Sequence, residues 1–147
     1  MITIHHTVAA AVSLEVAFDY VDDYRHVPDW MFGITRFEPR GVVTHGLGAT
    51  FDTAMKVGPT ALPSVVQVTA WEKNRLIGLD AVEGFVTTSR WQFHDAGDQL
   101  TTIEVDFGYE LPGGLAGRAL GHLLGPFVTQ AIRHTDAALR HNLDMLA

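Results

Sequence analysis

The stretch "LTTIEVDFGYEL" (residues 100–111) decides the fold class of this chain. Apolar and polar side chains alternate along it, and an alternation of period two is typical of a β-strand with one buried face. The apolar face would carry Ile103, Val105, Phe107 and Tyr109. The opposite face would carry polar side chains such as Glu104 and Asp106. The stretch therefore predicts a strand that packs one side against a core.

Further strand-like runs precede this stretch, and most are rich in β-branched or aromatic residues. They lie at residues 3–12, 34–43, 49–57, 64–72, 75–83 and 85–94. From residue 34 onward the connections between them are short and of turn type, so neighbouring strands should pair antiparallel. The sequence therefore predicts seven strands, the last six of them consecutive.

Helical segments interrupt and follow these strands. Ser13 stands at an N-cap position, so a helix should begin directly after it. We expect the helical run to break near Val27 and to restart at Pro28, because the residue before a proline avoids the α region. After "PGG" (residues 112–114), apolar residues at helical spacing predict a long helix that reaches the C-terminus and is kinked at Pro126.

The polar segment "DDYRHVPDW" (residues 22–30) is either a metal site or the junction between two helices. Metal ligands at i, i+3 or i, i+4 share one face of a helix, but Pro28 should break the helix between Asp22 and Asp29. We therefore interpret the aspartates as residues at helix ends. No HExxH motif or compact set of His and carboxylate residues occurs elsewhere. We expect no metal and no other cofactor. Trp30 would be buried, either in the core or at the rim of a pocket.

The predicted order of elements is one strand, two short helices, six antiparallel strands and a long helix, which is an α+β fold. The only partner for the long helix is the apolar face of the sheet. A sheet of seven strands is wider than one helix, so a sheet that curls around the helix leaves part of its apolar face uncovered. That uncovered face would line an internal cavity, which is the default site for a ligand.

Three motifs resemble a known group: "S-x-E-x-x-F-x-Y-x-x-D" at 13–23, "VPDW" at 27–30 and "VTAWEKNRLIG" at 68–78. Together with the order of elements, they are similar to the START-like, Bet v 1-like superfamily, and within it to the polyketide cyclase/dehydrase (SRPBCC) family. The resemblance covers nearly the whole chain. It implies a helix-grip fold over residues 1–147 as a single domain, with a deep hydrophobic cavity between the sheet and the C-terminal helix. Members include lipid and plant-hormone carriers and polyketide aromatase/cyclases.

Composition excludes several classes of function. The chain has 147 residues, a net charge of −7 and no cysteine. An acidic chain without clustered cations is not expected to bind nucleic acid or an anionic membrane surface. No apolar stretch is long enough for a membrane span, and no basic start followed by an apolar run suggests a signal peptide. We therefore expect a soluble cytoplasmic protein without stable membrane insertion, either a monomer or a homodimer.

The aromatic face of the predicted sheet holds most of the candidate ligand-binding residues. Some of these side chains would form core and the others would line the pocket, together with apolar residues of the long helix. The candidates are Trp30, Phe51, Met55, Trp71, Phe85, Ser89, Trp91, Phe93, Phe107, Tyr109, Leu120, Leu124 and Phe127.

Four residues are candidates for a catalytic role. Asp80 follows Gly78 in a strand, and it points either inward, as a carboxylate whose pKa burial would raise, or outward, as a surface charge. His122 lies in the glycine-rich half of the long helix, near a possible cavity entrance. Arg90 and Tyr109 are the other ionisable residues that an acid–base reaction could use.

Three functions follow from these features. The first is the binding of a hydrophobic small molecule, such as a lipid, a polyketide or an aromatic compound, in the cavity. The second is a reaction of the cyclase/dehydratase type in the same cavity, by general acid–base catalysis without a metal or nucleotide cofactor. The third is a protein-interaction module with a filled core. We favour the first, because one face is aromatic and the residues form no catalytic set.

Overall fold

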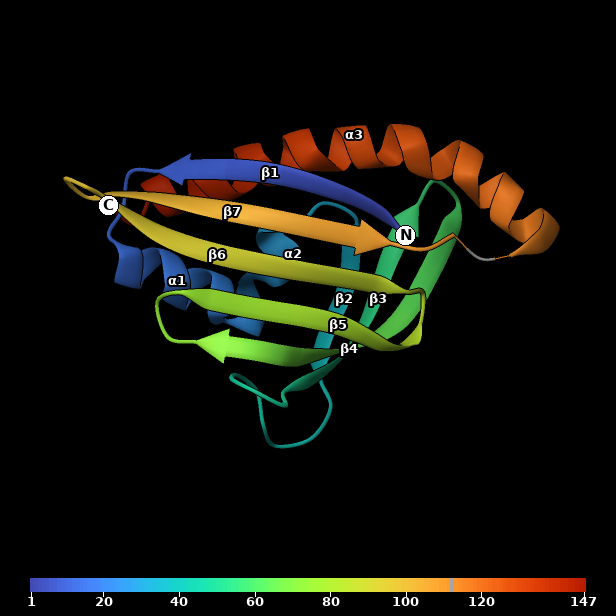
Figure 1. The fold of residues 1–147 in the computed structure, drawn as a ribbon, viewed down its shortest axis with the longest axis horizontal. Helices are drawn as coiled ribbons and strands as arrows, with labels where there is room; N and C mark the ends of the chain where they lie inside the picture. The colour runs from blue at the N-terminus through green and yellow to red at the C-terminus, as the bar shows by residue number, and fades with distance from the viewer. Residues whose placement is uncertain (112) are drawn as a thin grey trace.

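The computed structural model describes residues 1–111 and 113–147, and of the residues in its last helix it describes no side chain at 114–116. The elements follow the predicted order (Figure 1). The strands are β1 (Ile2–Ala10), β2 (Ile34–Pro39), β3 (Thr50–Val57), β4 (Thr60–Glu72), β5 (Leu76–Gly84), β6 (Thr87–Gly97) and β7 (Leu100–Tyr109). The helices are α1 (Leu14–Asp22), the short 3-10 helix η1 (Tyr24–His26), α2 (Val27–Trp30) and α3 (Gly114–Asp144).

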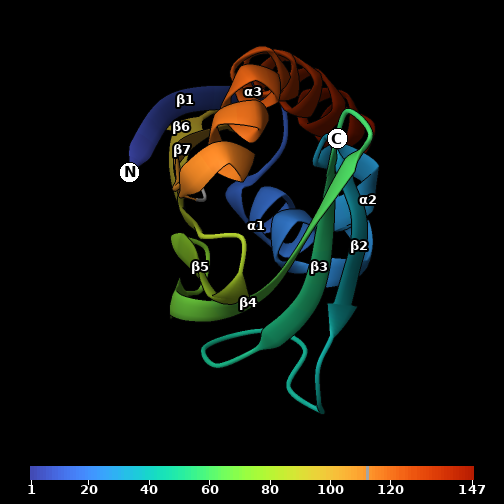
Figure 2. The same ribbon diagram turned by 90° about the vertical axis from the view of Figure 1, so that its right-hand side faces the viewer.

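All seven strands form one antiparallel sheet in the order β1-β7-β6-β5-β4-β3-β2. The sheet is strongly curled: β1, β7, β6 and β5 form one side, β3 and β2 form the other, and α3 lies across the opening between them (Figure 2). The long strand β4 joins the two sides. Its pairing with β5 shifts register at Val65/Val66 and at Val68/Ala70, and bulges of this kind bend a strand and increase its twist. This architecture is the helix-grip fold.

Helix α1 has the predicted N-cap, but it ends earlier than predicted. The Ser13 hydroxyl accepts a hydrogen bond from the backbone N–H of Val16 at 3.3 Å, as expected of an N-cap. The helical run ends at Asp22, earlier than the predicted break near Val27, because Asp23 is extended and its carboxylate accepts from the backbone N–H of Arg25 at 3.0 Å. A new short helix then begins at Val27, beside Pro28.

Two strand boundaries also differ from the prediction. The run at 34–43 ends as a strand at Pro39, and the residues up to Ala49 form an irregular connection. The segment 58–63 was expected to be a turn, but β4 begins at Thr60 and pairs with Val57 across a two-residue turn at Gly58 and Pro59. Gly58 has φ +57, which lets the chain reverse in so few residues.

Helix α3 is anchored at its C-terminal half. Leu139 and Leu143 are fully buried in the main core cluster, where they join Phe18 of α1 and Phe93 of β6. Phe18 packs edge-on against Phe93 with ring centroids 5.1 Å apart. Pro126 lies inside α3 as predicted, and the N-terminal part of the helix projects past the ends of the strands (Figure 1). The helix therefore packs into the main core at its C-terminal end, and Leu120 and Leu124 pack in a second cluster with Val57 and Tyr109.

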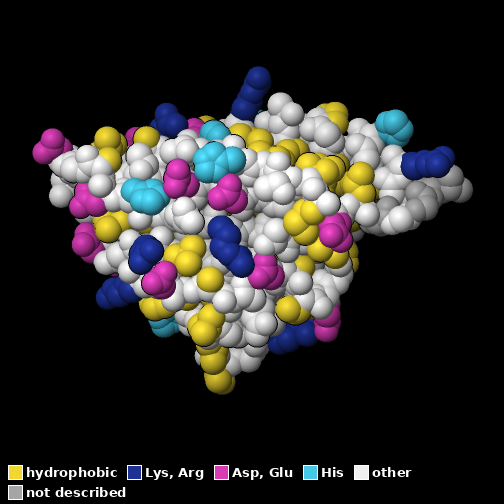
Figure 3. All heavy atoms as spheres, in the orientation of Figure 1, with side chains coloured by type: hydrophobic (Ala, Val, Ile, Leu, Met, Phe, Trp, Pro, Cys, Tyr) yellow, Lys and Arg dark blue, Asp and Glu magenta, His cyan; other side chains and the backbone are white. Residues whose placement is uncertain are grey.

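The outer face of the sheet is polar. His5 pairs with Asp106 at 2.7 Å, and His94 pairs with Glu104 at 2.9 Å. Histidine side chains, acidic side chains and side chains of Lys or Arg lie interspersed on this face (Figure 3). This arrangement confirms the alternation predicted for residues 100–111. None of the helices in the described part of the chain has the length and hydrophobicity that a membrane span requires.

Candidate functional site

A cavity of about 120 Å³ lies between the inner face of the sheet and α3. Its walls come from β1, β3, β6, β7, the segment after α2, the turn between β5 and β6, and the inner side of α3. The lining is mostly aliphatic and aromatic: Ile4, His6, Val8, Met31, Phe32, Met55, Phe85, Trp91, Val105, Phe107, Tyr109, Leu124, Phe127, Val128, Ala131, Ile132, Thr135 and Asp136. The cavity lies where the curled sheet is wider than the helix that covers it.

The structure sorts the predicted ligand-binding residues into three groups. The first group lines the main cavity: Met55, Phe85, Trp91, Phe107, Tyr109, Leu124 and Phe127. The second group, Trp30 and Phe51, lines a smaller hollow beside it. The third group, Trp71, Ser89, Phe93 and Leu120, lines neither space. Direct contact with a ligand is therefore expected only of the first two groups.

Packing explains why the third group lies outside both cavities. Phe93 is buried against Phe18 at the α1 end of the sheet, and the Trp71 ring packs edge-on against Phe18 at 5.7 Å. The Ser89 hydroxyl accepts a hydrogen bond from Trp91 Nε1 at 3.2 Å, so it holds the Trp91 ring in place. Leu120 is buried beside the main cavity in a cluster with Tyr109. Ser89 and Leu120 thus support residues of the cavity wall, whereas Trp71 and Phe93 pack around Phe18.

The smaller hollow has a volume of about 40 Å³ and lies between α2 and strands β2 to β6. Met31 and Trp91 line both hollows, so they form the partition between them. Trp30 is 3% exposed, and its Nε1 has no hydrogen-bond partner among the residues that the structure describes. Trp30 therefore fits both predicted placements: it belongs to the core cluster, and it also faces the smaller hollow.

Asp80 points outward, so the inward alternative is wrong. Its carboxylate accepts hydrogen bonds from the hydroxyls of Thr69, at 2.6 Å, and Thr88 on the outer face of the sheet, and Arg90 lies 3.5 Å away. Partial burial opposes ionisation, but these two hydrogen bonds and the Arg90 charge outweigh it and lower the pKa of Asp80. The adjacent Gly78 has no side chain in the space that the Arg90 guanidinium occupies. Asp80 and Arg90 are thus an outer-face pair that cannot reach a ligand in the cavity.

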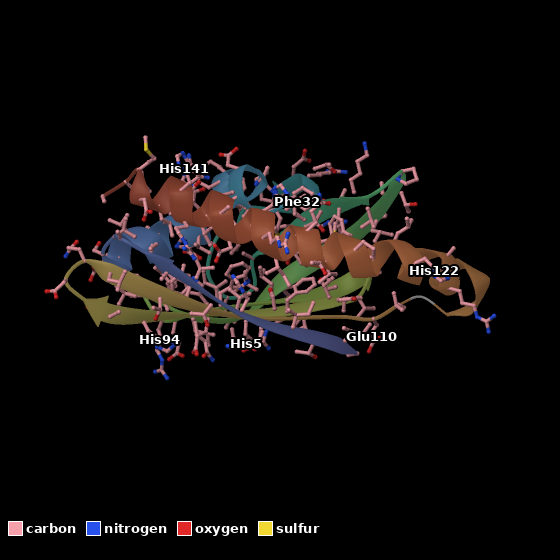
Figure 4. All side chains as sticks on the ribbon, turned by 90° about the horizontal axis from the view of Figure 1, so that it is seen from above. His5, Phe32, His94, Glu110, His122 and His141 are labelled. Atoms are coloured by element: carbon pink, nitrogen blue, oxygen red, sulfur yellow. The ribbon has the colours of Figure 1, made fainter. Side chains whose placement is uncertain are left out.

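The remaining catalytic candidates do not converge either. His122 is exposed on the projecting part of α3 (Figure 4). Tyr109 is 5% exposed and lines the main cavity. Of the four catalytic candidates, Tyr109 is therefore the one that the structure places in the cavity wall.

The structure adds a polar pair that the sequence analysis missed. His6 of β1 and Asp136 of α3 both line the main cavity, and His6 Nε2 lies 2.8 Å from Asp136 Oδ1. The alternation of Ile4, His6 and Val8 along β1 could have indicated that His6 faces inward. Nothing in the sequence links it to Asp136, which is 130 residues away.

The segment "DDYRHVPDW" holds helix ends and no metal site. Asp23 caps η1, and Asp22 accepts a hydrogen bond from Trp71 Nε1 at 2.9 Å. Within residues 1–111 and 113–147, no group of three or more His, Cys, Asp or Glu side chains is arranged to hold a metal ion. The expected absence of a metal or cofactor stays a prediction.

Comparison with known families identifies the fold's relatives. The model of the family described as "Polyketide cyclase / dehydrase and lipid transport" matches residues 1–144. The chain belongs to this family. A comparison with curated proteins found no match.

Solved structures share the fold at low sequence identity. A START superfamily protein from Mycobacterium smegmatis has 19% identity and a TM-score of 0.77, with 99% of each chain covered. A protein from Thermus thermophilus has 13% identity and a TM-score of 0.82, again with 99% of each chain covered. The Zhui aromatase/cyclase from Streptomyces sp. R1128 has 14% identity and a TM-score of 0.77, with 97% of this chain and 93% of that chain covered. At these identities, the neighbours show that the chain shares their fold.

Proposed function

We propose that this protein binds a hydrophobic small molecule in the cavity between the sheet and α3. The observation that carries the proposal is the apolar lining of that cavity, to which Phe85, Phe107 and Phe127 contribute aromatic rings. Burial of apolar ligand surface against such walls supplies ~25 cal/mol per Å². The proposal covers a lipid, a polyketide or an aromatic compound as the ligand.

The size of the cavity narrows the range of ligands. Pockets that hold drug-sized ligands measure roughly 300–1,000 Å³. The main cavity measures about 120 Å³, near the roughly 150 Å³ of apolar cavities that bind benzene. In this conformation a single aromatic ring, or one end of a longer apolar molecule, fits. A polyketide would require the cavity to widen.

A cavity-filling substitution tests this proposal. Ala131 faces the cavity from α3, whereas Ala137 is exposed on the same helix. We expect Ala131→Phe to weaken toluene binding at least tenfold in an NMR shift titration, because the new ring occupies the ligand's space. The matched variant Ala137→Phe should bind toluene like the wild type. Equal binding by the wild type and Ala131→Phe would contradict a site in this cavity.

A second function is a reaction of the cyclase/dehydratase type in the same cavity. The observation in its favour is that Tyr109, His6 and Asp136 line the cavity, so groups able to transfer protons face its interior. A poly-β-ketone substrate should then form its aromatic product faster with the wild type than with Tyr109→Phe. Asp80→Asn, on the outer face, is the matched control and should keep the wild-type rate. A product rate equal to that without protein would exclude this function.

Other predictions from the sequence remain predictions. They are a single domain over residues 1–147, a cytoplasmic location, the absence of nucleic-acid partners, and a monomeric or homodimeric state.

A further inference from the structure

A chain of polar side chains joins β1 to α3 at the edge of the main cavity. His6 Nε2 lies 2.8 Å from Asp136 Oδ1, and Arg140, one turn further along α3, lies 3.0 Å from Asp136 Oδ2. The Asp136 side chain is 19% exposed and the His6 side chain is 36% exposed. Both residues line the cavity as well. The pair therefore lies at the boundary between solvent and the apolar interior.

The contacts of this pair leave one ring nitrogen of His6 free. A carboxylate only accepts hydrogen bonds, so the His6–Asp136 contact requires the hydrogen of the imidazole on Nε2. Among the described residues the His6 ring makes no other hydrogen bond, which leaves Nδ1 for a further partner. In the neutral ring Nδ1 accepts a hydrogen bond, and in the charged ring it donates one. A hydroxyl group can satisfy both states, because it both donates and accepts.

The cavity wall has other polar groups besides His6 and Asp136: the hydroxyls of Thr135 and Tyr109, and Trp91 Nε1. The Thr135 hydroxyl accepts a hydrogen bond from the backbone N–H of Phe32 at 3.1 Å. Trp91 Nε1 donates to Ser89. Among the described residues, the hydrogen of the Thr135 hydroxyl on α3 and the Tyr109 hydroxyl on β7 remain available in the lining. His6 therefore combines two properties. A charged partner sets its orientation, and its ring still has a free nitrogen.

From this geometry we propose that His6, oriented by Asp136, forms a hydrogen bond to the single hydroxyl group of an otherwise apolar ligand. The ligand class is a compact aromatic alcohol or enol whose ring occupies the cavity. This inference rests on the proposed binding function and specifies which ligands the site selects. Apolar walls supply affinity, and the one polar contact fixes orientation.

Phenol and toluene form a matched pair of probes, since they have nearly the same size and differ in one hydroxyl. Toluene leaves water more readily, so an apolar cavity without a polar partner prefers toluene. We expect the wild type to bind phenol at least as tightly as toluene in NMR shift titrations. His6→Phe should lower the ratio of phenol affinity to toluene affinity about tenfold, which corresponds to the loss of one hydrogen bond. The ratio is the readout, because His6 lines the cavity and its replacement can change both affinities together.

His5→Phe is the matched control, because it makes the same change at the neighbouring residue on the outer face and should alter neither affinity. Tyr109→Phe and Thr135→Val each remove one of the other available hydroxyls of the lining. Because both residues line the cavity, these variants can change both affinities, but the ratio of phenol affinity to toluene affinity should stay near the wild-type ratio. Loss of the preference for phenol in either variant but not in His6→Phe would overturn the assignment to His6. A wild type that binds toluene well and phenol poorly would overturn the inference while leaving the binding function standing. Failure to bind either probe would overturn both.

A measurement on the unaltered protein covers the case in which His6→Phe does not fold. In protein labelled with ¹⁵N at histidine, phenol should shift the Nδ1 resonance of His6, and toluene should not. The outer-face His5 provides the internal reference. Equal responses to phenol and toluene at His6 would contradict the proposed hydrogen bond.

Discussion

At the residue scale, Asp22 shows how the environment of an aspartate changes its pKa and its effect on stability. It ends α1, it is half-buried, and it accepts a hydrogen bond from Trp71 Nε1. Burial raises the pKa of Asp22 above its ordinary value and outweighs the opposite effects of the Trp71 hydrogen bond and the His45 charge. A carboxyl whose pKa is raised by folding stabilises the folded state at low pH, and this contribution is lost as the pH rises through the folded pKa.

Asp22→Asn should therefore increase the free energy of unfolding at pH 7. The amide oxygen can still accept from Trp71, and the half-buried charge is gone. The advantage should disappear as the pH falls below the raised pKa of the carboxyl, where the wild type is also neutral. Urea denaturation at pH 7 and at pH 3 measures this difference. Asp19→Asn, an exposed change on the same helix, should have little effect at either pH, and a less stable Asp22→Asn at pH 7 would refute the argument.

At the element scale, α3 has two halves with different tasks. Its C-terminal half carries Leu139 and Leu143, both fully buried, and so attaches the helix to the core. The cavity is covered by the middle of the helix, from Leu124 to Asp136. The N-terminal half contains Pro126 and exposes Leu123. Pro126 has no N–H to donate to the carbonyl four residues earlier, so this half lacks one helical hydrogen bond.

Leu139→Ala should lower the free energy of unfolding by about 2–5 kcal/mol, because it leaves a void in a closely packed core. Leu123→Ala makes the same change where the side chain is 39% exposed, and it should cost less than about 0.5 kcal/mol. Urea denaturation compares the two variants. Similar losses for both would contradict the placement of Leu139 in the closely packed core.

At the scale of the whole molecule, the curl of the sheet produces two hollows that share one partition. Met31 follows α2, and Trp91 comes from β6, so the partition forms only when the short helices dock inside the sheet. The main hollow measures about 120 Å³ and the smaller one about 40 Å³. Shortening the flexible partition residue should join them.

Met31→Ala should let biphenyl bind, because a two-ring molecule can then extend from one hollow into the other. It should also cost about 2 kcal/mol in the free energy of unfolding. Met55→Ala removes the same side chain from the wall of the main cavity without opening the partition, so it is the matched control and should bind biphenyl less tightly. NMR titration measures the binding, and tighter binding by Met55→Ala would contradict the role given to Met31.

Much of this molecule could be predicted because local patterns control it. Alternation along residues 100–111 predicted which side of β7 faces the core, Ser13 predicted the start of α1, and the residues after "PGG" predicted α3. Predictions were weakest where no periodic pattern exists. The break at Asp23 and the start of β4 at Thr60 depend on individual hydrogen bonds and turns.

The sequence by itself determined the order of the elements, the apolar and polar faces of the sheet, and the membership of the family, since each depends on residue spacing along the chain. Only the tertiary structure decided that Asp80 points outward, that Met31 divides the cavity, and that His6 meets Asp136 at its edge. These three facts depend on how far the sheet curls and where α3 crosses it. Curl and crossing are set by bulges in β4 and by core packing, which involve residues far apart in the chain.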